Sequence, residues 1–215
     1  MEEKPSSLPE EFGLLHLCFS GVGDPRHRRG LVHPLAGVLS LSVLALMAGC
    51  RSLSDVSRWG ALHPEVFGPL GLRRSPSVAT LGRLLRWVSV AQVRQALRDF
   101  TAALLERRGY AGELAVAADG KSLRGIWEEG QQLGLVHLFV HQAQLILDQV
   151  PATYHLDEVK ATQRWVEEVA CEFPGLSVLT GDALLADRTL CTAIVAQGQD
   201  YFLKLKKTNP PCTRM

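Results

Sequence analysis

Two apolar runs that each end in an aspartate decide the fold of the second half of this chain: Leu114-Ala-Val-Ala-Ala-Asp119-Gly-Lys-Ser and Leu176-Ser-Val-Leu-Thr-Gly-Asp182-Ala. Short apolar runs bounded by turn-forming residues are typical of buried strands, so each aspartate is predicted at a strand end. Two neighbouring carboxylates repel each other unless a cation lies between them. The pair is therefore a candidate metal site, although an aspartate at a strand end is also a common structural feature.

The segments around these runs predict a mixed sheet. After Gly112 the expected elements are three strands, a helix, a strand, a helix and a strand, at residues 114–118, 133–142, 145–150, 157–173, 176–180, 187–197 and 200–206. This order resembles that of an RNase H-like α/β fold, in which the first and fourth strands are neighbours. We therefore expect Asp119 and Asp182 to meet.

Everything before Gly109 has helical periodicity. The uncharged segment 34–50 is at the short limit for crossing a bilayer of about 30 Å, and a buried core helix is the preferred interpretation. Ser52 is predicted to cap a short helix through Trp59, because its side-chain oxygen can accept a hydrogen bond from a free backbone N–H. Residues 90–108 are predicted to form a long helix that ends at Gly109.

A helix capped by Ser77 carries Arg83 and Arg86 on one side. Such a helix could lie against DNA phosphates, and it could equally be an ordinary amphipathic surface helix.

Charge and composition divide the chain. Residues 1–110 contain 14 basic and 9 acidic side chains, whereas residues 111–215 contain 9 and 13. We predict a flexible tail over 1–23, a helical domain over 24–110 and a catalytic α/β domain over 111–215. The five cysteines form no Cys-x-x-Cys pair, and this favours a reducing cytoplasm over a disulfide framework or a thiolate zinc site.

Several strings resemble one family. Asp119-Gly-Lys-Ser-Leu-Arg-Gly125 is similar to the Asp-Gly-Lys-x-Leu-Arg-Gly block of the DDE transposases grouped with the H-repeat-associated proteins of Rhs elements. Asp24-Pro-Arg-His-Arg-Arg-Gly and Pro76-Ser-Val-Ala-Thr80 resemble that family's N-terminal associated region. Thr180-Gly-Asp182-Ala and Gly198-Gln-Asp200-Tyr-Phe-Leu-Lys-Leu-Lys206 resemble its second-aspartate block and the following strand.

The resemblance implies a bacterial, cytoplasmic insertion-sequence transposase with no membrane segment. Asp119 and Asp182 would be the first two acids of an Asp-Asp-Glu triad and would hold Mg²⁺ or Mn²⁺. The DNA partner would be the terminal repeats of the element, bound mainly by the basic N-terminal part. A homodimer is a further possible assembly.

Other candidates have two interpretations. Lys121 and Arg124 could each contact a DNA phosphate near the metal or be solvated turn residues. His137 and His141 lie four residues apart in a predicted strand and share a face, and half-buried sheet histidines are preferred over metal ligands. Asp148 is predicted to be a turn or edge residue.

The chain also departs from the family pattern. No Asp or Glu follows Asp200, whereas the family carries its third acid in a downstream His-Gly-Arg-x-Glu block. Glu158 and Lys160 stand where the family tends to show Glu-Lys-Ser-Asn-Glu, and their roles stay open. We therefore expect a C-terminally truncated transposase without strand-transfer activity. The alternatives are a DNA-binding or dimerising fragment that represses transposition and a general metal-dependent nuclease.

Overall fold

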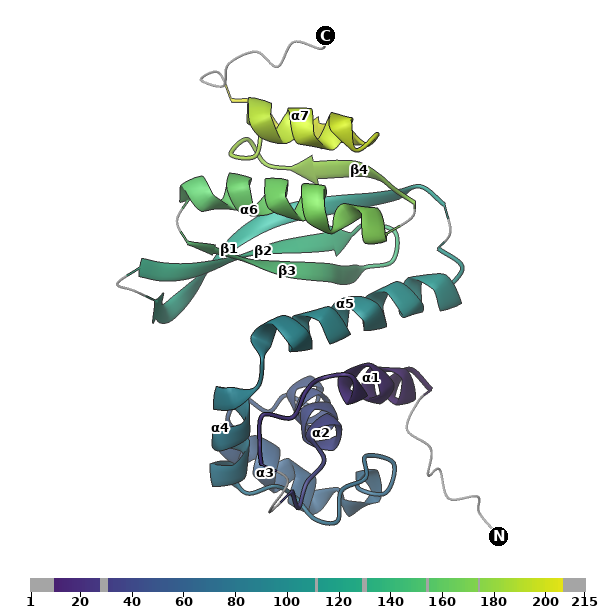
Figure 1. Cartoon of the computed structure of the whole chain (residues 1–215), viewed down its shortest axis with the longest axis vertical. Coiled ribbons are helices and arrows are strands. Elements are labelled where there is room, and N and C mark those ends of the chain that lie inside the picture. Colours follow the sequence, from purple (N-terminus) through teal and green to yellow (C-terminus); the bar gives the residue numbers. More distant parts are fainter. Residues whose placement is uncertain are drawn as a thin grey trace. The chain divides into compact units, whose positions relative to one another are not determined.

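The computed structural model describes residues 10–27, 31–110, 112–128, 131–153, 155–173 and 175–206. The chain divides into two compact units, residues 1–100 and 101–215, which are described separately. The helices of the N-terminal half are α1 (Glu10–Ser20), α2 (Leu35–Met47), α3 (Leu53–Leu62), the short 3-10 helix η1 (Pro64–Val66), α4 (Val78–Trp87) and α5 (Val90–Arg107) (Figure 1).

The helix boundaries follow the capping signals. Ser52 and Ser77 accept hydrogen bonds from the backbone N–H groups of Asp55 and Thr80, so both predicted caps are confirmed. Gly49 and Gly109 follow α2 and α5 with φ of +92° and +74°. Glycine adopts this left-handed conformation without a steric penalty, and it is the usual residue after a helix.

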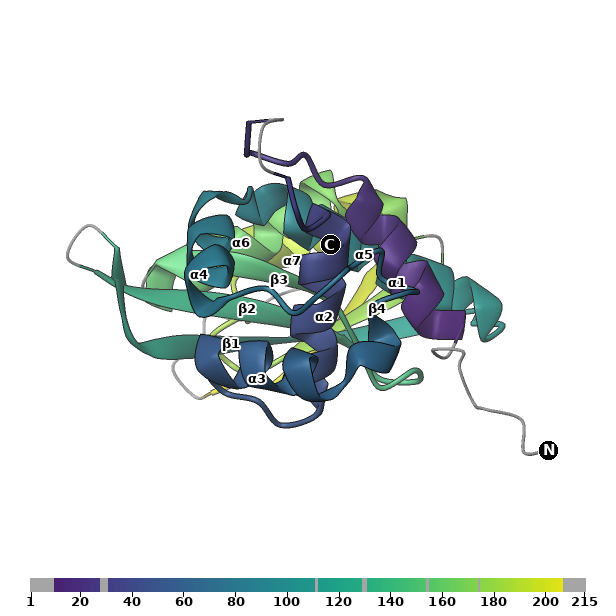
Figure 2. The same ribbon diagram turned by 90° about the horizontal axis from the view of Figure 1, so that it is seen from below.

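Helix α2 is the buried centre of the helical unit, as the sequence predicted. Val38, Leu41 and Ala45 are fully buried in it. The neighbouring helices α1 and α3 both contact α2, which lies between them in Figure 2. Across the described part of the chain, none of the helices is long and apolar enough to cross a membrane.

The predicted flexible tail is wrong for residues 10–23. Residues 10–20 form α1, and Leu15 and Phe19 are 3% and 2% exposed in the core of the helical unit. Their spacing of four residues places both side chains on one face of the helix. The polar composition of residues 1–7 obscured this apolar pair.

The second unit is a five-stranded mixed sheet with helices, which confirms the α/β prediction. Its elements are β1 (Leu114–Glu128), β2 (Gln131–Val140), β3 (Leu145–Thr153), α6 (His155–Glu168), the 3-10 helix η2 (Ala170–Glu172), β4 (Leu176–Gly181), α7 (Arg188–Ala196) and β5 (Asp200–Leu203). The strand order is β3-β2-β1-β4-β5. Strands β1, β2 and β3 form the predicted antiparallel meander, and β4 and β5 are parallel to β1.

Strand β1 is longer than predicted. It continues past Asp119 to Glu128, because its antiparallel pairing with β2 extends from Val116↔Val140 to Glu128↔Gln131. The prediction of a strand end at Asp119 is therefore wrong. Asp182, in contrast, directly follows the last residue of β4.

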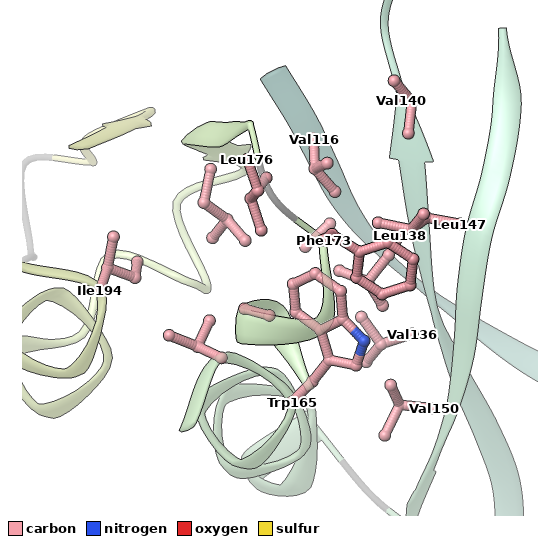
Figure 3. Packing of buried hydrophobic residues seen from close by; sticks show 14 of the residues in the cluster. Val116, Val136, Leu138, Val140, Leu147, Val150, Trp165, Phe173, Leu176 and Ile194 are labelled. Atoms are coloured by element: carbon pink, nitrogen blue, oxygen red, sulfur yellow. The ribbon is translucent and has the colours of Figure 1, made fainter. Parts of the chain in front are cut away.

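The core of the sheet unit centres on Trp165 of α6. Its ring stacks on Phe173 at a centroid distance of 6.4 Å and lies beside Val136 and Leu138 of β2 (Figure 3). The indole Nε1–H donates a hydrogen bond of 3.0 Å to Oδ2 of Asp148 in β3.

Asp148 lies in the edge strand β3, as one of the two predicted alternatives had it, but its side chain is a buried acceptor, 4% exposed, and it is not part of a turn. An apolar sheet face accepts a carboxylate only when the carboxylate is hydrogen-bonded. The backbone N–H of Gln149 provides a second donor at 2.7 Å.

Candidate functional site

The pairing of β1 with β4 brings the two predicted metal ligands to equivalent positions. The parallel register ends at Ala118↔Gly181, and Asp119 and Asp182 are the next residues on the two strands. Side chains alternate between the two faces of a strand. Because Val116 and Ala118 point into the core under α6, Asp119 points to the opposite face.

Both carboxylates are open to solvent. The Asp119 side chain is 67% exposed, and its Oδ2 lies 3.9 Å from Nζ of Lys121. Asp182 is exposed, and its Oδ1 accepts a hydrogen bond of 2.9 Å from the backbone N–H of Leu184. This turn fixes one oxygen of Asp182, while Asp119 has only a distant and exposed ion pair.

Histidines and a threonine neighbour the pair. His137 is the cross-strand partner of Asp119 and is half-buried, and its half-burial was the preferred interpretation of the sequence. His141 lies beyond the end of β2 and is exposed, and its Nε2 is 3.0 Å from Oγ1 of Thr180. Within the described ranges, no group of three or more His, Cys, Asp or Glu side chains is arranged to hold a metal ion.

Glu158 approaches the residue after Asp119. A Cβ built on Gly120 would lie 2.2 Å from Cδ of Glu158, so the carboxylate occupies the space that a side chain at position 120 would need. Glu158 lies in the first turns of α6 and is half-buried. The structure thus brings Glu158 to the neighbouring position of β1, on the side of the sheet covered by α6. The contact between Glu158 and Gly120 requires a glycine at position 120. The sequence spacing of these two residues does not predict this contact.

The predicted DNA-binding residues fall in both units. Arg83 and Arg86 are exposed on α4, and Nε of Arg83 donates to the carbonyl oxygen of Ala79 at 3.2 Å. Lys121 is exposed in β1. The side chain of Arg124 lies outside the described residues.

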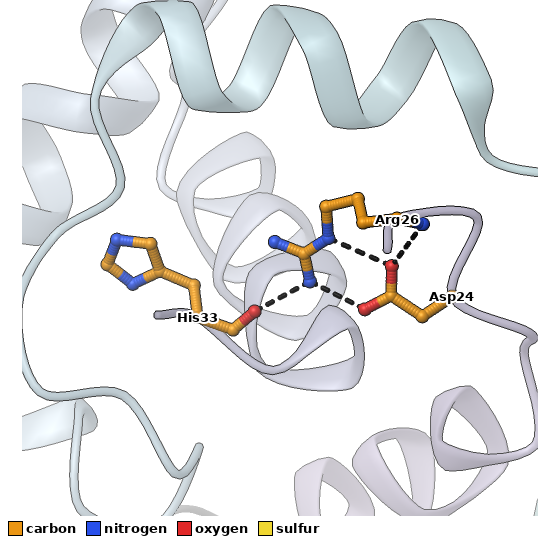
Figure 4. Close-up of polar contacts among 3 residues, drawn as sticks. All are labelled: Asp24, Arg26 and His33. Atoms are coloured by element: carbon orange, nitrogen blue, oxygen red, sulfur yellow. Dashed lines mark hydrogen bonds and ion pairs between the residues drawn. The ribbon is translucent and has the colours of Figure 1, made fainter. Parts of the chain in front are cut away.

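Arg26, which belongs to the Asp24-Pro-Arg-His-Arg-Arg-Gly motif, is held by three side-chain hydrogen bonds in the helical unit. The Arg26 guanidinium donates to both carboxylate oxygens of Asp24, at 2.9 and 2.6 Å, and to the carbonyl oxygen of His33 at 2.7 Å (Figure 4). The hydrogen bond from the Arg26 side chain is the largest cause that lowers the pKa of Asp24. The chain therefore turns back on itself around one ion pair.

Sequence comparisons relate the chain to known proteins. Residues 16–101 match the family model described as DDE_Tnp_1-associated, so this part of the chain is of the kind associated with DDE transposases. No solved structure gives a significant match.

Three relatives from Escherichia coli K12 extend the match into the sheet unit. "Putative protein YbfL" is 23% identical over 190 residues, which are 86% of this chain and 49% of YbfL. "H repeat-associated putative transposase YhhI" is 22% identical over 192 residues, 87% of this chain and 49% of YhhI. The similarly named YbfD is 22% identical over 190 residues, 86% of this chain and 73% of YbfD.

The chain is thus similar to the H repeat-associated putative transposases, and residues 16–101 match the associated family model. It spans about half the length of YbfL and YhhI.

Proposed function

We propose that this chain is a DNA transposase of the DDE type, whose sheet unit provides two metal-binding carboxylates, Asp119 and Asp182. The observation that carries the proposal is the parallel register Ala118↔Gly181, since the next residue on each strand is one of these aspartates. The strand order β3-β2-β1-β4-β5 supports an RNase H-like fold for this unit. That fold is the one the family resemblance implies.

The donor set suits Mg²⁺ or Mn²⁺. Carboxylate oxygens are the preferred ligands of these hard ions, and both side chains are accessible from solvent. Asp119 and Asp182 would hold the ion, and the hydrogen bond from Leu184 N–H would orient Asp182. When bound, the metal supplies activation of the attacking water or 3′-hydroxyl and stabilisation of the leaving oxygen in phosphodiester cleavage.

Lys121 has a separate role in this proposal. Its Nζ lies 3.9 Å from Asp119 and is exposed, so the ammonium group offsets part of the carboxylate repulsion. A lysine at this position can also contact a DNA phosphate next to the cleaved bond.

A cleavage assay on DNA that carries the terminal repeats tests the proposal. We expect no strand transfer and only weak Mn²⁺- or Mg²⁺-dependent cutting by the wild-type chain, and that weak cutting should fall to background in Asp119→Asn and Asp182→Asn. The matched control is Asp200→Asn, because Asp200 is an exposed aspartate at the start of the neighbouring strand β5, outside the pair. Equal loss of cutting in all three variants would contradict the assignment of the pair.

A direct metal readout complements the assay. Manganese binding followed by electron paramagnetic resonance should weaken in Asp119→Asn and Asp182→Asn and persist in Asp200→Asn. Cutting without preference for the terminal repeats would favour a general nuclease.

The second candidate is a non-catalytic DNA-binding or dimerising protein that represses transposition. The observation in its favour is the excess of basic side chains in residues 1–110 together with the exposed Arg83 and Arg86 of α4. This candidate predicts salt-dependent binding to the repeats, with no cutting that depends on Asp119. The cleavage assay and a binding assay on the same DNA separate the two.

A further inference from the structure

A cavity of about 390 Å³ opens in the helical unit between α4 and the segments 25–27 and 31–33. Its walls include Arg74, Arg83 and Trp87, together with Arg26 and His33. The volume lies within the range of small-molecule pockets, about 300–1,000 Å³.

The cavity carries uncompensated positive charge. Arg26 is neutralised by Asp24 at 2.6 Å. Within the described residues, Arg74 and Arg83 have no carboxylate at salt-bridge distance, and Arg83 donates a hydrogen bond to the backbone carbonyl of Ala79. Both arginines are exposed, and guanidinium groups bind phosphate oxygens in a two-pronged geometry. The cavity therefore favours an anion.

His33 provides a buried polar group on the cavity wall. The residue is 5% exposed, and its Nδ1 has no hydrogen-bond partner in the part of the chain that the structure describes. Figure 4 shows its ring pointing away from the Arg26 guanidinium. Burial, followed by the charges of Arg74 and Arg26, lowers the pKa of the ring. A neutral imidazole that lacks a partner is suited to hydrogen-bond a ligand.

The cavity also offers an aromatic surface. Trp87 ends α4 and is 58% exposed, and the apolar side chains of Leu31 and Val32 line the cavity and are 41% and 49% exposed. Nucleobases stack on exposed aromatic rings irrespective of their sequence. Positive charge beside an exposed indole therefore matches the two parts of a nucleotide.

We propose that this cavity receives one unpaired nucleotide of a DNA strand, with its phosphate at Arg74 and Arg83 and its base against Trp87. The proposal rests on the proposed function in one respect, the choice of DNA as the partner. The nucleotide must be unpaired because a base within a duplex is covered on both faces by its neighbours and cannot stack on the indole. His33 would hydrogen-bond the nucleotide from the inner wall.

Fluorescence anisotropy tests the proposal with two labelled probes, a 16-nucleotide single strand and the duplex of the same sequence. The wild-type chain should bind the single strand more tightly. Trp87→Ala should weaken single-strand binding about tenfold, with a smaller effect on the duplex. Arg83→Ala should weaken single-strand binding about fivefold and reduce the salt dependence by about one ion, and Arg83→Lys should restore most of the loss.

Arg86→Ala is the matched comparison, because Arg86 lies on the same helix but is not part of the cavity wall. Arg86→Ala removes one positive charge outside the cavity, so it should weaken single-strand binding about twofold. Equal losses in Arg83→Ala and Arg86→Ala, or equal effects of Trp87→Ala on both probes, would overturn the cavity proposal, as would failure of the wild-type chain to bind the single strand.

A second readout reports stacking directly. A 2-aminopurine in the single strand should be quenched by the wild-type chain and remain bright with Trp87→Ala. The cleavage assay keeps the two proposals separate. Asp119-dependent cutting with no distinction between Arg83 and Arg86 would remove the cavity and leave the transposase. The predicted binding pattern without such cutting would remove the catalytic proposal and leave the cavity.

Discussion

In the helical unit, the contact between α2 and the turn after η1 depends on a missing side chain, whereas the sheet unit depends on a buried polar pair. Gly37 lies so close to that turn that a Cβ would be 2.2 Å from the carbonyl oxygen of Leu70. In the sheet unit, Trp165 instead donates to the buried Asp148.

The two units should therefore be destabilised by different kinds of substitution. A tight backbone contact is disrupted when a side-chain atom is added. A buried hydrogen bond is lost when its donor or acceptor is removed.

Gly37→Ala should give the largest loss. The backbone oxygen of Leu70 cannot move aside as a flexible side chain can, so α2 or the turn must shift. We expect the free energy of unfolding to fall by about 3 kcal/mol. Urea unfolding followed by circular dichroism measures the loss, and amide hydrogen exchange should localise it to α2 rather than to β1.

Gly13→Ala is the control for that change. Gly13 is exposed in α1, and a Cβ there would meet nothing within 4 Å. The substitution should raise stability by up to about 1 kcal/mol, because alanine favours helix. Similar losses in both variants would show that packing around Gly37 is not the cause.

Trp165→Phe should produce the second effect, in the sheet unit. Phenylalanine keeps most of the apolar contact with Phe173 but cannot donate to Asp148. We expect a loss of about 2 kcal/mol, since a buried acceptor is deprived of a donor. Urea unfolding measures it. Asp148→Asn keeps an oxygen that can accept from the indole, so it should lose less than Asp148→Ala, and the reverse order would refute the role of this hydrogen bond.

Asp24→Asn should have the smallest effect. The Arg26 hydrogen bond lowers the pKa of Asp24, so its contribution to stability is present above the ordinary aspartate pKa of about 3.9 and is lost as the pH falls through the lowered value. Because the pair is partly exposed, we expect less than about 1 kcal/mol at pH 7. The stability difference between wild type and variant should be constant above about pH 4 and shrink below it. A difference that grows in acid would contradict the assignment.

Much of the local structure was predictable because short-range signals decide it. Ser52, Ser77 and Gly109 mark helix ends through their own side chains or backbone conformation, and the structure confirms all three. The uncharged segment 34–50 similarly became the core helix α2. In contrast, α1 was missed because the polar composition of residues 1–7 obscured the buried pair Leu15 and Phe19.

Contacts between residues far apart in the sequence determine the features that the sequence pattern did not predict. The pattern alone suggested a strand end at Asp119, but hydrogen bonds to β2 carry β1 on to Glu128. The sequence did not show that the Asp148 side chain is buried in its edge strand, because its partner Trp165 lies on a helix 17 positions away. The cavity joins residues near 25–33 to residues 74–87, and no local period connects these segments.

The sequence by itself determined that the chain has a helical half and a strand-rich half, and that Asp119 and Asp182 each follow an apolar run, since periodicity and capping act over a few residues. Only the tertiary structure decided that β1 and β4 pair in the register Ala118↔Gly181, that Glu158 lies against Gly120, and that Arg74 and Arg83 share a cavity with Trp87. Each of these depends on which distant surfaces bury one another, and that choice is made by the packing of the whole unit.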